Sequence, residues 1–424
     1  MSGGTNGSRA NGTSAEEPVT GYLSLVEIEN IRSIASLRWR VEPEPGWNVV
    51  LGDNGAGKST FLRAVAYCIL PFDERMSLRI PPTHWMRHSG LSGKFEIKVS
   101  VRDGATEPLC TALVDHVKLD SSGTHTRHTE SPNHAMRPLF SAGFGPFRRF
   151  TGGDPEYEGQ FDAFPRVARV VSLFDERVSL SGSLAWLKLL RFKELEEDVA
   201  SGSLIASLRS FVNQPGFLPD GARLGRITSD RVYFTDGNGA EVAIEELSDG
   251  YRSILSLILE LIRQLASHYG PEHVFDPSSK TVIAPGIVLI DEVDAHLHPS
   301  WQRRIGLFLR ACFPAIQFIV TTHSPLVCQA AEVGTVFQLP RPGTSKEGRL
   351  VTGAELDRLL YGDLVEAYET EAMGGIGRSD RAKELLGTFA ALNRKAIDEG
   401  LSDEERKEQR RLRAIFPTSS ETLP

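Results

Sequence analysis

One short segment has the residue types and spacing of a phosphate-binding loop, GxxxxGK[ST]: Gly52-Asp53-Asn54-Gly55-Ala56-Gly57-Lys58-Ser59-Thr60. Its glycines allow backbone N–H groups to converge on phosphate oxygens, and a helix that begins here adds favourable partial charge. We expect Lys58 to reach the terminal phosphates of a nucleotide and the Ser59 hydroxyl to ligate Mg²⁺. The residues expected to contact the nucleotide are Asn54, Gly55, Ala56, Gly57, Lys58, Ser59 and Thr60.

A pair of carboxylates, Asp291 and Glu292, directly follows the apolar run of residues 287–290. At the end of a strand, the first carboxylate can hold Mg²⁺ through water, and the second can orient or deprotonate an attacking water. A single acidic pair is often only a solvated turn. Here the phosphate-binding loop is expected at the same sheet edge, which favours a Mg²⁺ role for Asp291 and a catalytic role for Glu292.

His323 follows another apolar strand, which ends at Thr322. In this position its imidazole can contact a γ-phosphate. A lone histidine is more often structural or exposed. The position of His323 after the other motifs favours the catalytic interpretation.

The segment of residues 246–252, Glu-Leu-Ser-Asp-Gly-Tyr-Arg, begins a strongly amphipathic helix. The Ser248 hydroxyl and Gly250 at a helix N-terminus form a site suited to a nucleotide phosphate. The alternative is that Ser248 is only the N-cap of this helix.

The elements that position these residues can be read from hydrophobic periodicity. Residues 22–28 and 35–41 alternate like a hairpin, and a buried strand at 47–51 leads into the phosphate-binding loop. Helices are expected at 184–199 and 204–211. A hairpin is expected around Asp236-Gly237-Asn238-Gly239.

Two continuous apolar strands, at 287–290 and 317–321, flank a helix at 301–311. This alternation indicates a parallel sheet covered by helices. The predicted fold class is therefore α/β, a P-loop NTPase head with a mixed sheet flanked by helices. The expected division is a disordered tail at 1–20, an N-terminal lobe at 21–70, an inserted helical and β lid at 71–240, a C-terminal lobe at 241–340 and a helical region at 341–424.

Composition narrows the class of protein. Hydrophobic residues make up 40% of the chain, which supports a buried core, and the formal charge of −8 does not favour a surface coated in positive charge. This net charge does not exclude a local groove that binds nucleic acid. The four cysteines include no CxxC pair, and no apolar run reaches the roughly 18 residues needed to span a bilayer. We expect a cytoplasmic protein with no membrane partner.

The order phosphate-binding loop, LSDGYRS segment, Asp291-Glu292 and His323 resembles that of the ABC ATPase superfamily. The resemblance implies ATP and Mg²⁺ as cofactors. It also implies a head-to-tail homodimer in which Ser248 and Gly250 bind the γ-phosphate of ATP held by the second subunit.

The runs Asp-Glu-Val-Asp-Ala-His-Leu-His-Pro at 291–299 and Thr-His-Ser-Pro at 322–325 are similar to the DExxxHLHP subgroup. That subgroup includes OLD-family ATPases and Septu-type anti-phage ATPases. Ile31-Arg32-Ser33 resembles the opening of SMC- and RecF-like heads, which implies that Arg32 lies near the nucleotide. The resemblance implies an ATP hydrolase that controls a partner effector in anti-phage defence. The alternatives are an SMC/RecF-like ATPase that senses or repairs DNA, and, less favoured, the energy subunit of a transporter.

Some features depart from the family pattern or have two interpretations. Gln160 and Gln214 are both poorly placed for a Q-loop. The C-terminal region lacks nuclease motifs, so a nuclease would be a separate partner.

Four histidines are close together in the sequence, and they fit exposed loop histidines better than a metal site: His116, His125, His128 and His134. Arg127, Arg148 and Arg149 are candidates for nucleic-acid phosphate contacts, although lone arginines usually form surface pairs.

Overall fold

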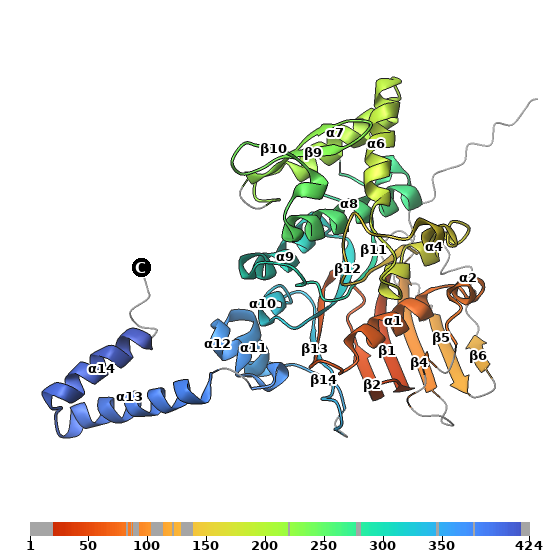
Figure 1. Ribbon diagram of the computed structural model, residues 1–424. Helices are drawn as coiled ribbons and strands as arrows, with labels where there is room; N and C mark the ends of the chain where they lie inside the picture. The colour runs from red at the N-terminus through yellow and green to blue at the C-terminus, as the bar shows by residue number, and fades with distance from the viewer. Residues whose placement is uncertain are drawn as a thin grey trace, which may run out of the picture.

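The computed structural model describes residues 20–81, 84, 85, 87, 93–102, 113–120, 123–128, 139–218, 221–276, 281–344, 347–375 and 378–416. Three sheets and their flanking helices make up this part of the chain (Figure 1). The predicted α/β class, with a mixed sheet flanked by helices, is confirmed.

The central sheet has six strands in the order β14-β13-β3-β12-β11-β7. All neighbouring pairs are parallel except β13 with β14. The five parallel strands therefore end at one common edge, where the loops that follow them meet. The strand bounds are β3 Gly46–Leu51, β7 Ser141–Phe144, β11 Gly286–Ile290, β12 Ile316–Thr322, β13 Val336–Gln338 and β14 Arg349–Leu350.

A second sheet of five antiparallel strands, in the order β2-β1-β4-β5-β6, lies beside the central one (Figure 1). The predicted hairpin of residues 22–28 and 35–41 forms its β1 and β2. The bounds are β1 Thr20–Ile31, β2 Ile34–Arg40, β4 Gly93–Arg102, β5 Leu113–Asp120 and β6 Gly123–His128.

The central strands are buried on both faces, as their continuous apolar runs predict. Successive side chains alternate between two cores. Val288 and Val320 join the core formed with helices α8 and α9, while Leu289 and Ile319 join the core formed with α1 and the antiparallel sheet. These helices are α1 Lys58–Ile69, α8 Asp249–Tyr269 and α9 Pro299–Cys312.

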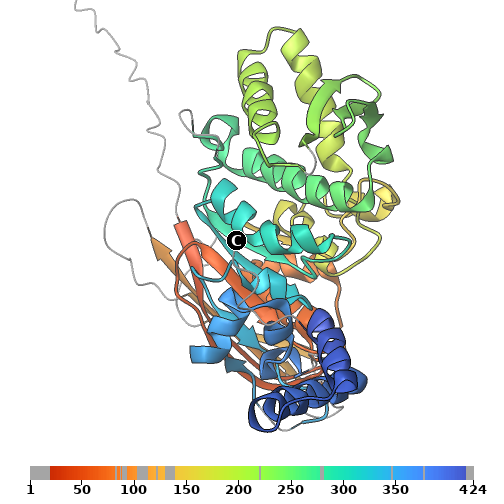
Figure 2. The ribbon, with the colours of Figure 1, turned by 90° about the vertical axis from the view of Figure 1, so that its left-hand side faces the viewer.

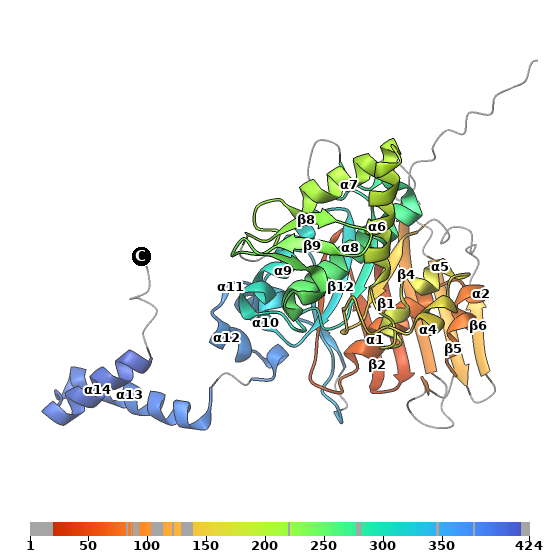
Figure 3. The same ribbon diagram turned by 45° about the horizontal axis from the view of Figure 1, so that its top comes forward.

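A helical and β insertion packs on α8, at the top of Figure 1 and again in Figure 3. It contains α6 Gly182–Leu195, α7 Val199–Val212, β8 Arg223–Ile227, β9 Val232–Thr235 and β10 Glu241–Ala243. The two predicted helices and the predicted β9–β10 hairpin are confirmed. In its turn, Asp236 Oδ1 accepts hydrogen bonds from the backbone N–H groups of Asn238 and Ala240.

The range 71–240, expected to form a lid, contributes to all three sheets. Strand β4 pairs with β1, and β7 pairs with β11 in the central sheet. Strand β7 is only four residues long and reads Ser-Ala-Gly-Phe, so hydrophobic periodicity gives little indication of it. Short helices α2 Phe72–Arg75, α4 Pro155–Gly159 and α5 Pro165–Ala168 complete this range.

The C-terminal region is helical, as predicted. It contains α11 Gly353–Tyr361, α12 Leu364–Tyr368, α13 Asp380–Asp398 and α14 Asp403–Ile415, and α10 Pro325–Cys328 precedes it. Helix α14 begins with a capping box formed by Ser402 and Glu405. Helices α13 and α14 form a hairpin that projects from the rest of the molecule in Figure 1 and faces the viewer in Figure 2. Among the described residues, no helix combines the length and apolar character that crossing a membrane requires.

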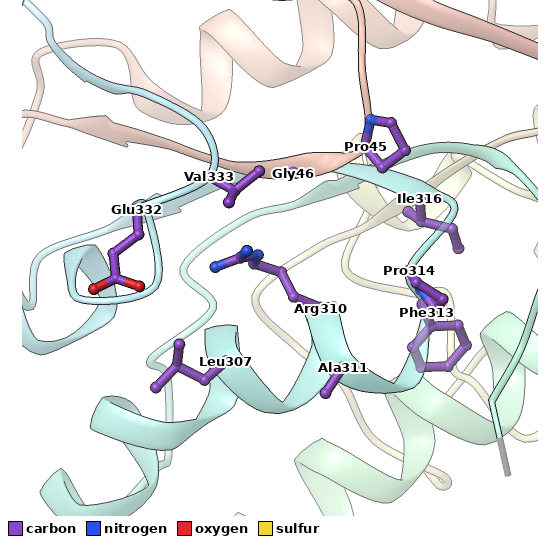
Figure 4. Close-up of a pocket in the computed structure, with 10 residues that line it drawn as sticks. All are labelled: Pro45, Gly46, Leu307, Arg310, Ala311, Phe313, Pro314, Ile316, Glu332 and Val333. Carbon is purple, nitrogen blue, oxygen red and sulfur yellow. The ribbon is translucent and has the colours of Figure 1, made fainter. Parts of the chain in front are cut away.

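A pocket of about 440 Å³ lies at the opposite edge of the central sheet, where β3 and β12 begin (Figure 4). Arg310 at the end of α9 projects into it, and its Nη1 donates to the Ala330 carbonyl at 2.9 Å. Because parallel strands start at this edge, the pocket is distinct from the site formed where they end.

Candidate nucleotide-binding site

The phosphate-binding loop connects β3 to α1, as its sequence predicts. Gly57 is the N-cap of α1 at φ 102°, a left-handed conformation that favours glycine. A Cβ at this position would lie 2.5 Å from Ser33 Oγ and 2.9 Å from Ile34 Cγ1. The β1–β2 turn therefore presses directly against the loop, and no larger residue fits at position 57.

The Lys58 side chain is buried and folds back over the loop. Its Nζ donates to the Gly52 carbonyl at 2.8 Å and to the Asp53 carbonyl at 3.3 Å. Burial lowers the pKa of Lys58, and the negative charges of Glu292, Asp291, Asp294 and Asp53 oppose this shift. The fold thus brings the lysine and the two predicted carboxylates to one site.

Asp291 is almost completely buried, and its carboxylate is held by the neighbouring strand. Thr321 Oγ1 donates to Asp291 Oδ1 at 2.5 Å and accepts a hydrogen bond from the Glu292 backbone N–H at 2.8 Å. One hydroxyl on β12 therefore fixes both residues of the pair. Sequence patterns had not singled out Thr321, although its position two residues before His323 was visible.

Replacing Thr321 with valine is expected to lower the free energy of unfolding by about 1–3 kcal/mol, because a buried carboxylate and a buried N–H lose their partner. Urea denaturation measures this change. Thr321→Ser keeps the hydroxyl and serves as the control, with a smaller loss. A valine variant as stable as the wild type would contradict the assigned hydrogen bonds.

The side-chain oxygen atoms where the parallel strands end are ligands that suit Mg²⁺. Ser59 offers a hydroxyl and Asp291 a carboxylate, both oxygen donors, and Mg²⁺ typically takes few protein ligands and keeps several waters. Among the described residues, no cluster of three or more His, Cys, Asp or Glu side chains forms a metal cage. The chemistry of Ser59 and Asp291 fits a metal shared with nucleotide phosphates, and their role as its protein ligands stays a prediction.

Arg148 is buried beneath the carboxylate pair, which corrects the hypothesis that it contacts nucleic-acid phosphate. Its guanidinium donates to the backbone carbonyls of Asp291 at 2.8 Å and Glu292 at 3.0 Å. Arg149 is exposed and donates to the carbonyls of Gly152 and Glu176. The side chain of Arg127 lies outside the described part of the chain.

His323 lies at the same edge, beside the phosphate-binding loop. Burial and the positive charge of Lys58 lower its pKa, and the charges of Asp294, Glu292 and Asp53 act in the opposite direction. The neutral imidazole is thereby favoured near pH 7, in a form that can accept or donate one hydrogen bond.

The C-terminal region contributes residues to this site that the sequence did not indicate. Tyr368, Ala372 and Met373 line a pocket of about 230 Å³ together with Gly52 and His323. Arg341 forms an ion pair with Asp53 at 3.5 Å. Residues after 340 thus cover one side of the phosphate-binding loop.

Arg32 lies in the β1–β2 turn that touches Gly57 through Ser33. Its Nε donates to the His84 carbonyl at 2.7 Å, and its guanidinium lies 5.7 Å from the centre of the Trp85 ring. Burial, followed by the charge of Arg63, lowers the pKa of Arg32. Arg32 is next to the loop, and its contact with a nucleotide stays a prediction.

Ser248 and Gly250 lie at the start of α8, as predicted, but away from Lys58. They line a separate cavity of about 610 Å³ with His296, His298 and Trp301 among others, and none of the phosphate-loop or carboxylate residues lines it. Ser248 is the exposed N-cap of α8, yet its side chain makes no capping hydrogen bond. Ser248 therefore lacks the side-chain hydrogen bond to the backbone that a simple N-cap would make.

Neither glutamine considered for a Q-loop is near this site. Gln160 is exposed at the end of α4, and Gln214 Nε2 contacts Cys312 Sγ at 3.7 Å. The loop that follows β7, beside Asp291, instead carries Arg148.

The histidine-rich segment forms strands, which corrects its assignment to a loop. His116 lies on β5, and His125 and His128 lie on β6. Their side chains, and all of His134, lie outside the described part of the chain.

Known proteins and family models match parts of this chain. Residues 131–329 match a family model described as "AAA domain, putative AbiEii toxin, Type IV TA system", and residues 25–103 match one described as "AAA domain". The Septu protein PtuA of Bacillus mycoides (strain KBAB4) is 28% identical over 323 residues, which are 75% of this chain and 40% of that protein.

A retron protein and an SMC head domain are also similar to parts of this chain. The Retron Ec83 probable ATPase of Escherichia coli is 38% identical over 141 residues, 33% of this chain and 24% of that protein. The SMC head domain from Thermotoga maritima superposes with a TM-score of 0.41 at 14% identity, covering 78% of this chain and 99% of that one. The chain thus spans less than half the length of these Septu and retron relatives. In its motifs, their arrangement at one sheet edge and these partial sequence matches, the chain resembles ABC-type AAA ATPases, the Septu and retron proteins among them.

Proposed function

We propose that this chain binds ATP with Mg²⁺ at the phosphate-binding loop and hydrolyses it between two subunits arranged head to tail. One observation carries the proposal: Ser248 and Gly250 line a cavity separate from the one that Gly52 of the phosphate-binding loop and His323 line. At each of the two cavities these residues are of types that bind phosphate. A second copy of the chain can supply its Ser248 and Gly250 to the nucleotide held by the first, and the site is then complete only in the dimer.

Each residue has a distinct task in this proposal. Lys58 leaves its loop carbonyls to pair with the β- and γ-phosphates, while backbone N–H groups of residues 54–59 surround them. Glu292 orients the attacking water and accepts its proton, and His323 contacts the γ-phosphate. Ser59 and Asp291 would hold Mg²⁺, which would neutralise charge on the phosphates.

The biological role that we propose is control of a partner effector in anti-phage defence, with a nuclease on a separate chain as the candidate effector. Support comes from the partial similarity to the Septu and retron proteins. A DNA-sensing ATPase is the rival hypothesis, and the burial of Arg148 removes one of the basic contacts it would use. ATP hydrolysis measured with and without duplex DNA separates the two, since the rival requires stimulation by DNA.

Changing Ser248 to arginine tests the composite site. We expect the variant to bind ATP nearly as tightly as the wild type, because Lys58, Ser59 and Asp291 are untouched. ATP-dependent dimerisation and hydrolysis should both be lost, since the added cation fills the space that the other subunit's γ-phosphate needs. Size-exclusion chromatography with ATP, together with a phosphate-release assay, measures both.

Ser248→Ala is the matched control. It removes the hydroxyl without filling the space, and it should retain part of the dimer. Because the Ser248 side chain makes no capping bond, neither variant should lower the melting temperature much. An arginine variant that hydrolyses ATP normally as a monomer would place the whole active site in one chain and rule out the proposed dimer.

A further inference from the structure

Arg148 is only 5% exposed, and its guanidinium makes five hydrogen bonds to neighbouring protein atoms. Three of them go to consecutive backbone carbonyls in the carboxylate turn, those of Asp291, Glu292 and Val293. A fourth goes to the Gly145 carbonyl at 3.1 Å, within its own loop. The fifth joins Nε to Ser253 Oγ on α8 at 3.2 Å.

Burying a cation here is costly and requires compensation. Burial lowers the pKa of Arg148 to about 10, and the negative charges of Asp294, Asp291 and Glu292 oppose this shift. None of the five hydrogen bonds goes to a carboxylate. The guanidinium therefore holds the main chain of the turn and leaves the carboxylates of Asp291 and Glu292 available for other ligands.

The turn needs such support because Glu292 has φ 46°, a left-handed conformation that a non-glycine residue adopts at a cost. The hydrogen bonds of Arg148 fix the carbonyls of Glu292 and of the residues on either side. Thr321 Oγ1 in turn accepts a hydrogen bond from the Glu292 N–H. The direction of the Glu292 side chain is thus set by backbone contacts that surround it.

The hydrogen bond to Ser253 connects the turn to α8, the helix whose first turn carries Ser248 and Gly250. Ser253 is buried on α8, five residues after Ser248. The Arg148 side chain therefore connects two elements. One is the Glu292 turn, which acts on the nucleotide bound to the same subunit. The other is α8, which in the proposed dimer contacts the nucleotide bound to the partner.

We infer that Arg148 is a positioning residue for ATP hydrolysis: it holds the Glu292 turn in its left-handed conformation and fixes that turn to α8. The inference rests on the proposed function, because it assigns Glu292 the role of general base. It predicts that Arg148 acts on the rate of the chemical step through Glu292 and has little effect on ATP binding.

The test is a double-mutant cycle with Arg148→Lys and Glu292→Gln. Lysine keeps the charge but cannot span three carbonyls with a planar fork. Arg148→Lys should lower kcat by up to about 10²-fold, since a small displacement of a catalytic group has an effect of this size. The ATP dissociation constant should stay within about threefold of the wild-type value. In the Glu292→Gln background, the same change should alter the residual rate by less than about threefold.

Arg149→Lys is the matched control. This neighbouring arginine is exposed and contacts only carbonyls outside the turn, so kcat should not change. Thermal melts establish that each variant is folded. If Arg148→Lys does not fold, Ser253→Ala removes one hydrogen-bond acceptor and should lower kcat about fivefold, the effect of a single hydrogen bond.

The outcomes are distinguishable. Multiplicative effects of Arg148→Lys and Glu292→Gln on kcat would overturn the inference and leave the proposed ATPase intact, as would an unchanged kcat in folded Arg148→Lys. Unchanged kcat in folded Ser253→Ala would equally overturn the link to α8. A wild-type chain that does not hydrolyse ATP would overturn the proposed function, and the inference with it.

Discussion

Changing Glu292 to glutamine is expected to reduce ATP hydrolysis by about 10²-fold or more, while ATP remains bound. The amide keeps the shape of the side chain but cannot accept a proton from the attacking water. The backbone of the turn should be unaffected, because Arg148 and Thr321 bind main-chain atoms of residue 292. Single-turnover hydrolysis of labelled ATP measures the rate, and filter binding measures retention.

Trapped ATP should also hold two copies of this variant together. Light scattering coupled to size-exclusion chromatography would then show a dimer with ATP and a monomer without it. Glu404→Gln, an exposed position on α14, makes the same chemical change away from the site and should behave as the wild type. A Glu292→Gln variant that stays monomeric with ATP bound would argue against the head-to-tail dimer.

Changing Lys58 to alanine is expected to weaken ATP binding so far that it can no longer be measured at ordinary ATP concentrations. Two charge-assisted hydrogen bonds to the terminal phosphates would be lost, which corresponds to a fall in affinity of about 10²- to 10⁴-fold. The variant should still fold, because Lys58 contacts only two carbonyls of its own loop. Equilibrium binding of labelled ATP, with a thermal melt of the same sample, separates loss of binding from loss of structure.

Lys193→Ala is the control for this variant. Lys193 is exposed on α6, in the insertion that packs on α8, and its loss should leave binding unchanged. Wild-type affinity in folded Lys58→Ala would refute the assignment of the phosphate-binding loop. Because binding precedes hydrolysis, Lys58→Ala should also abolish ATP-dependent dimerisation.

The amino-acid sequence by itself determined the residues of the phosphate-binding loop, the carboxylate pair and the histidine, together with the sheet that aligns them. These are local signals. A glycine-rich loop between a strand and a helix is encoded within about ten residues, and apolar strands alternating with helices imply parallel pairing. Parallel strands end at one edge, so the meeting of Lys58, Asp291 and His323 followed from the order of elements.

Only the tertiary structure decided which residues support that site. Arg148 contacts carbonyls 143–145 residues away in the chain, and Tyr368 and Met373 reach a pocket at the phosphate-binding loop from the C-terminal region. In the sequence, Arg148 looked like an exposed basic residue beside Arg149. Its burial depends on four elements packing together: the loop after β7, the end of β11, the turn at Glu292 and α8. No local pattern records such a contact, because hydrogen bonds to backbone carbonyls place no demand on the identity of the residues that accept them.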